Sequence, residues 1–92
     1  MPSLDALYAE WEATQSVRAT LQVLEALRGQ GATERVSVVC RFATTSMWSN
    51  VPVLVLAGRV YLDDGRLSEA QATLVAAGKL APQNAEVYRW LG

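Results

Sequence analysis

Apolar residues recur along the chain at the spacing of an α-helix. Near the start, Leu4, Leu7, Tyr8 and Trp11 follow one another at i, i+3, i+4 and i+7, which places them on one helix face. Ser3 precedes them and is a residue type that caps helices. This pattern predicts an N-terminal helix from Ser3 to about residue 14.

The same spacing continues through four further segments. It predicts a second helix over residues 17–28, which the GQG sequence after it would end. A third helix is expected over residues 33–45, although the many β-branched residues there would also suit a strand. Two more helices, over residues 51–63 and 67–80, flank the turn sequence DDGR, and Pro82 would end the last one. The last two segments therefore predict an antiparallel helical hairpin.

An internal repeat favours a helix for the ambiguous third segment. At a shift of 34 residues, four pairs of identical residues coincide: Val17 and Val51, Gly31 and Gly65, Ala43 and Ala77, Asn50 and Asn84. The glycine pair falls at the turn, the alanine pair at the crossing of two helices, and the asparagine pair at the residue before a new helix. A period of this length is typical of stacked helical hairpins.

Residues 51–84 resemble the tetratricopeptide repeat, whose pattern is W-x2-L-G-x2-Y, then A-x3-F and a later P. The matching or turn-forming residues are Leu54, Gly58, Tyr61, Gly65, Ala70, Leu74, Ala77 and Pro82. Small side chains stand where two helices must approach closely, and large ones fill the space between them. Bulk at any small site is expected to separate the helices.

The rest of the chain resembles less regular copies of the same unit. Residues 17–50 are similar to a degenerate repeat, with Leu24 in place of the Gly and Trp48 in place of the Pro, so we expect a slightly splayed helix pair. Residues 85–92 are similar to the opening of a third repeat, and residues 3–14 would form an N-terminal cap.

The resemblance implies one all-α domain over residues 1–92. Its fold would consist of antiparallel helical hairpins stacked as a short right-handed tetratricopeptide solenoid.

Composition excludes several classes of function. The net charge of −1 comes from acidic and basic residues spread along the chain, so no basic cluster favours nucleic acid or an anionic membrane. The start resembles no secretory signal, and no segment is apolar for long enough to span a bilayer. One cysteine and no histidine exclude an internal disulfide and the common metal sites. We expect a cytoplasmic, cofactor-free protein, and the Ala-, Val-, Leu- and Arg-rich composition is typical of a GC-rich bacterial gene.

Candidate catalytic groups are few. Asp63 and Asp64 are adjacent carboxylates, but their place in a turn favours solvated turn residues over an acid/base or metal site. Cys40 falls on the inward face of its helix and has no histidine to activate it, which favours a packing role. The three tryptophans, Trp11, Trp48 and Trp90, are expected to pack between helices rather than form a ligand site. We therefore do not expect an enzyme.

The resemblance implies a concave groove, lined by the first helix of each repeat, that takes a peptide or a partner helix. The corresponding residues are Arg18, Leu21, Gln22, Glu25 and Arg28 from the first copy, Val55, Arg59, Leu62 and Asp63 from the second, and Glu86 and Arg89 from the third. One subfamily of these repeats binds the C-terminal carboxylate of heat-shock chaperones through Lys and Asn side chains. The matching positions here hold other residues, so this carboxylate-binding site is absent. The alternative for these arginines is an ordinary solvated helix face.

Two hypotheses about function remain open. In the first, the chain is a protein-interaction module, a scaffold or adaptor, that binds another protein or peptide in the groove. In the second, it is an oligomerisation unit that forms homodimers through its C-terminal end, where Tyr88, Trp90 and Leu91 make an uncapped apolar face. Because about three repeats are needed for stability, we expect either this pairing or further repeats beyond Gly92.

Overall fold

The computed structural model describes residues 3–81, and this part of the chain is entirely helical, without strands. The helices, in chain order, are α1 (Leu4–Thr14), α2 (Val17–Leu27), α3 (Thr33–Ser46), α4 (Val51–Asp63) and α5 (Leu67–Leu80). Each begins and ends within one residue of the predicted position. The third segment is a helix, so the strand alternative is wrong. Its buried Val36, Val39 and Ala43 follow helical spacing, and packing outweighs the β-propensity of the segment.

Side-chain caps fix where three helices begin. The hydroxyl oxygens of Ser3 and Ser16 accept hydrogen bonds from the backbone N–H groups three residues later, each at 3.1 Å. The side-chain oxygen of Asn50 does the same for Val53 at the start of α4, also at 3.1 Å. Gly65 has a φ of +77°, a left-handed conformation that allows the reversal between α4 and α5. These caps and the glycine turn therefore determine where the helices begin and where the chain reverses direction.

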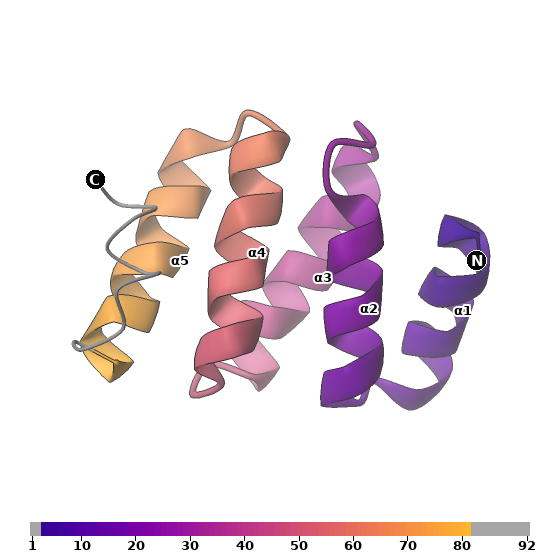
Figure 1. Cartoon of the computed structure of the whole chain (residues 1–92), viewed down its shortest axis with the longest axis horizontal. Helices are drawn as coiled ribbons and strands as arrows, with labels where there is room; N and C mark the ends of the chain where they lie inside the picture. The colour runs from indigo at the N-terminus through magenta and orange to yellow at the C-terminus, as the bar shows by residue number, and fades with distance from the viewer. Residues whose placement is uncertain (1–2, 82–92) are drawn as a thin grey trace.

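The helices form two layers with one helix at each end of the array. Helices α2 and α4 lie side by side, α3 lies behind them, and α1 and α5 occupy the two ends (Figure 1). Helix α4 is central, because it packs against α2, α3 and α5. A single cluster of buried side chains runs from Trp11 of α1 to Ala70 of α5 and forms the main core.

The α4–α5 hairpin packs more extensively than any other pair of helices in residues 3–81, and α2 packs less extensively on α3. In the close pair, a β-carbon added to Gly58 would lie 2.7 Å from Cγ of Leu74. Ala70 and Ala77 are fully buried on the facing helix. Small residues therefore stand where α4 and α5 are closest.

Helix α1 is joined to the core by a buried tryptophan, with Leu4, Leu7 and Tyr8 packed beside it. The Trp11 side chain is buried, and its Nε1–H donates to the Thr20 hydroxyl of α2 at 3.1 Å. Its ring also meets Phe42 of α3 edge-on, with centroids 5.3 Å apart. Arg35 of α3 adds an ion pair to Asp5, at 2.6 Å, so α1 is held by both following helices. The opposite face of α1 is exposed.

None of these helices has the length and apolarity needed to cross a bilayer; the longest in the described range have 14 residues.

Candidate functional site

The residues predicted to line a groove fall on two neighbouring helices. Those of the first copy lie on α2 or its C-cap, those of the second lie on α4, and these helices pack side by side. Arg18, Gln22 and Glu25 are exposed, whereas Leu21 and Leu62 are partly buried against the core. We call this surface the α2/α4 face; its described members are Arg18, Leu21, Gln22, Glu25, Arg28, Arg59, Leu62 and Asp63.

Val55 does not belong to this surface, which corrects the prediction. It is only 5% exposed and packs in a small apolar cluster with Leu54, Ala77 and Val51. The physical reason is the central place of α4, which is covered by helices on three sides. A position that would be open on a terminal helix is closed here.

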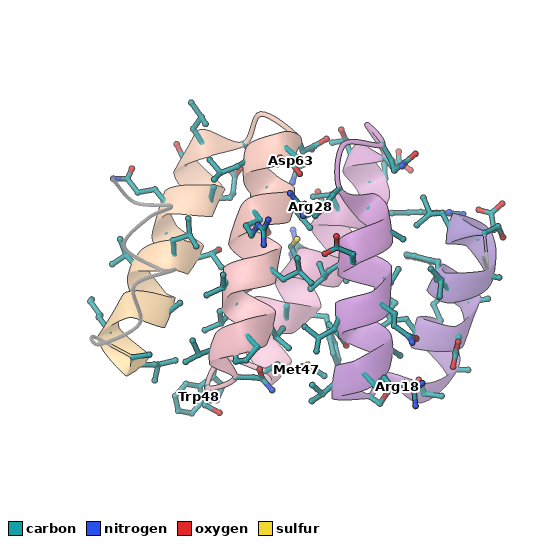
Figure 2. The ribbon with its side chains drawn as sticks, in the orientation of Figure 1. Arg18, Arg28, Met47, Trp48 and Asp63 are labelled. Carbon is teal, nitrogen blue, oxygen red and sulfur yellow. The ribbon has the colours of Figure 1, made fainter. Side chains whose placement is uncertain are left out.

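Arg28 and Asp63 join the two helices of the α2/α4 face at one end. The Arg28 Nε–H donates to Asp63 Oδ2 at 3.1 Å, and Arg28 Nη1 lies 3.4 Å from Glu25 Oε1. Figure 2 shows the two side chains together between the upper ends of α2 and α4, whereas Arg18 lies at the lower end of α2. The hydrogen bond to Asp63 is the main cause that raises the pKa of Arg28. Both residues were predicted to line the groove, but the ion pair between them was not predicted.

A signal for this pairing exists in the sequence. The two residues are 35 positions apart, close to the 34-residue repeat, and each stands at the end of a first helix. Opposite charges at the ends of α2 and α4 come close together because these two helices pack side by side.

The turn after α4 is less solvated than predicted. The Asp64 side chain is 7% exposed, and its Oδ2 lies 3.2 Å from Nε of Arg66. The Thr33 hydroxyl donates to Asp64 Oδ1 at 3.2 Å, so this carboxylate also ties the start of α3 to the α4–α5 turn. Over residues 3–81, no cluster of three or more carboxylate or thiol side chains could hold a metal ion. The adjacent aspartates thus serve as inter-helix ties.

Cys40 is a packing residue, as predicted. It is fully buried, and its thiol lies 3.7 Å from the backbone oxygen of Ala57 on α4. Burial raises the pKa of Cys40 to about 12, with small opposing effects of Arg66 and Asp64. A thiol that stays protonated and inaccessible is a poor nucleophile.

Trp48 contradicts the prediction that the tryptophans pack between helices. Its side chain is 62% exposed, whereas Trp11 is buried. Trp48 lies between the end of α3 and the Asn50 cap of α4. Because it is not part of a helix, the apolar spacing that predicts burial on a helix face does not apply to it. Figure 2 shows it projecting outward next to Met47.

A shallow pocket of about 290 Å³ lies beside Trp48. It is lined by Thr44 and Trp48 from α3 and the following turn, Leu54 and Tyr61 from α4, and Glu69, Ala72, Thr73 and Ala76 from α5. We call it the α3/α5 pocket. The sequence did not predict this pocket, because small exposed residues on α5 carry no pattern of their own.

The remaining predicted residues lie outside the described part of the chain. These are Pro82, Glu86, Tyr88, Arg89, Trp90 and Leu91. The groove contribution of the third copy and the C-terminal association face both stay predictions.

Comparison of the chain with protein-family models, curated proteins and solved structures finds no match.

Proposed function

We propose that this chain is a tetratricopeptide-type interaction module that binds a peptide or partner helix on its α2/α4 face. The observation that carries the proposal is the side-by-side packing of α2 and α4, with exposed Arg18, Gln22 and Glu25 along one of them. A row of exposed side chains on a fixed helical scaffold is suited to recognising an extended or helical segment.

Two features of the face support this proposal. The Arg28–Asp63 pair connects the two helices and would hold the surface in one shape before a partner arrives, which lowers the cost of binding. Partly buried Leu21 and Leu62 place apolar contact area among charged groups. Mixed apolar and charged surfaces are typical of protein interfaces.

The internal packing also supports the assignment to the family. Gly58 stands where α5 comes closest, and Leu54, Tyr61 and Leu74 are buried large residues at the signature positions. An enzymatic role has no support among the described residues, because Cys40, Asp63 and Asp64 are all committed to packing or ion pairs.

A photo-crosslinking experiment tests the proposal. A photoreactive phenylalanine analogue replaces Gln22 on the α2/α4 face or, as the matched control, Gln71 on α5, which is also exposed. Irradiation in the source cells should give a discrete crosslinked protein from position 22 that is absent from position 71. Identical patterns from both positions, or none from position 22, would contradict the proposed binding surface.

A further inference from the structure

The α3/α5 pocket has an apolar floor and walls of small side chains. Its floor comes from Leu54 and Tyr61, which are 1% and 7% exposed, and Ala72 and Ala76 form part of the α5 wall. Helices α3 and α5 both pack on α4 but not extensively on each other, so a hollow remains between them. The exposed indole of Trp48 stands at its edge. The hollow is thus open to solvent and bordered by a large apolar group.

The polar groups of the pocket do not converge on a small ligand. The Thr44 hydroxyl donates to the Arg41 carbonyl at 3.1 Å, and the Thr73 hydroxyl donates to the Glu69 carbonyl at 2.8 Å. Small-molecule sites, of roughly 300–1,000 Å³, also need several free polar groups to fix orientation. With an apolar floor and both threonine hydroxyls bonded within their own helices, the pocket instead suits an apolar side chain of a protein partner.

Glu69 gives the pocket its charge. It is exposed, lines the pocket, and forms no ion pair within residues 3–81, whereas the nearby Arg66 already pairs with Asp64. Arg41 on α3 is also exposed and, like Glu69, acts electrostatically on Tyr61, but it does not line the pocket. The charge that complements the pocket wall is therefore positive.

We infer that the α3/α5 pocket is a second docking site, which binds a peptide segment that inserts one Leu or aromatic side chain beside Trp48 and places a Lys or Arg against Glu69. This inference goes beyond the proposed function, because the pocket is formed by α3, α4 and α5 and shares no residue with the α2/α4 face. A peptide could occupy it whether or not that face binds a partner.

Three short synthetic peptides provide the probe. The first carries a Leu and a Lys one helical turn apart in an Ala- and Gln-based sequence, the second replaces the Leu with Ser, and the third replaces the Lys with Glu. NMR titration of the isotope-labelled full chain should shift the Trp48 indole and the Ala72 and Ala76 amides with the first peptide. Binding should be lost with the Ser peptide and weakened about fivefold with the Glu peptide.

Two variants locate the binding. Ala76→Leu fills the pocket from its exposed wall and should abolish the shifts, whereas Ala9→Leu, an exposed change on α1, should leave them unchanged. Glu69→Lys should reverse the preference between the Lys and Glu peptides, and Glu34→Lys, in the first turn of α3, should not. Each variant's helical circular dichroism checks that it is folded.

Binding of none of the peptides would overturn the inference. So would a preference for the Glu peptide in the wild-type chain, which would assign recognition to Arg41, or an unchanged preference in a folded Glu69→Lys variant.

Discussion

Gly58 of α4 lies directly against Leu74 of α5: a β-carbon at position 58 would be 2.7 Å from both Cγ and Cδ2 of that leucine. Leu74 is 1% exposed, so its side chain has little space into which it could move. The hairpin therefore depends on the absence of a side chain at one position.

Gly58→Ala should destabilise the fold. Overpacking costs about 1–3 kcal/mol, and the higher helix propensity of Ala returns only about 1 kcal/mol. We expect a net loss of roughly 1 kcal/mol in chemical denaturation. In a Leu74→Ala background the same change should become neutral or stabilising. Stabilisation by Gly58→Ala in the wild-type chain would show that the helices are not in close contact there.

Thr20→Val should cost more than its size suggests. The change keeps the volume but leaves the buried Trp11 Nε1–H without its acceptor at 3.1 Å. An unsatisfied buried donor costs about 1–3 kcal/mol of unfolding free energy. Thr73→Val is the matched control, because the Thr73 hydroxyl bonds only to a carbonyl of its own helix. Equal losses for the two variants would mean that the indole hydrogen bond contributes nothing measurable.

Alkaline pH should destabilise the chain partly through Cys40. Its pKa is about 12 when buried, against an ordinary value of 9.0, so the folded state retains a proton that the unfolded state releases. Stability from this group is complete below pH 9.0 and falls as pH rises towards 12, by up to about 1.4 kcal/mol per pH unit. Cys40→Ala should reduce this slope in denaturation measured across the range.

Part of the alkaline loss should persist in that variant. Burial also raises the pKa of Tyr61, so its hydroxyl acts in the same direction. Tyr61→Phe in the Cys40→Ala background should flatten the slope further. An unchanged slope after both substitutions would exclude these groups as the cause.

The Arg28–Asp63 pair should contribute modestly and in a salt-dependent way. Both side chains are about one-third exposed, at 30% and 33%, and exposed pairs are worth about 0.2–1 kcal/mol. A double-mutant cycle with Arg28→Met and Asp63→Asn should give a coupling energy in that range at low salt. The coupling should shrink in high salt because the charges are screened. A coupling that salt does not affect would indicate a packing effect of the Arg28 stem.

Four of the helices could be predicted because each carries its own local signal. Apolar spacing identified α1, α2, α4 and α5, and the repeat resolved α3 against its β-branched composition. Gly65 and the Asn50 cap are likewise local features whose chemistry is visible in a few neighbouring residues. Local signals of this kind do not require knowledge of which helices become neighbours.

The errors arose where burial depends on distant neighbours. Val55 follows the same spacing as exposed groove positions and is covered only because α4 is central. The sequence around Asp64 predicts a turn residue. Its hydrogen bond with Thr33 depends on the α4–α5 turn lying next to the start of α3, which the local sequence does not show. The hollow beside Trp48 belongs to three helices at once and to no single segment.

The Trp11 contact has a practical meaning for dividing this protein into fragments. Repeat alignment places a boundary at Val17, yet a cut there would remove the Ser16 cap of α2 and the indole that covers Thr20 and Phe42. The boundary of the predicted repeat is therefore not a boundary of the packing between helices. Any fragment intended to fold alone should keep α1 together with α2 and α3, and repeats exchanged with another protein should be joined after α3, before the Asn50 cap of α4, outside the contacts that α1 makes with both helices.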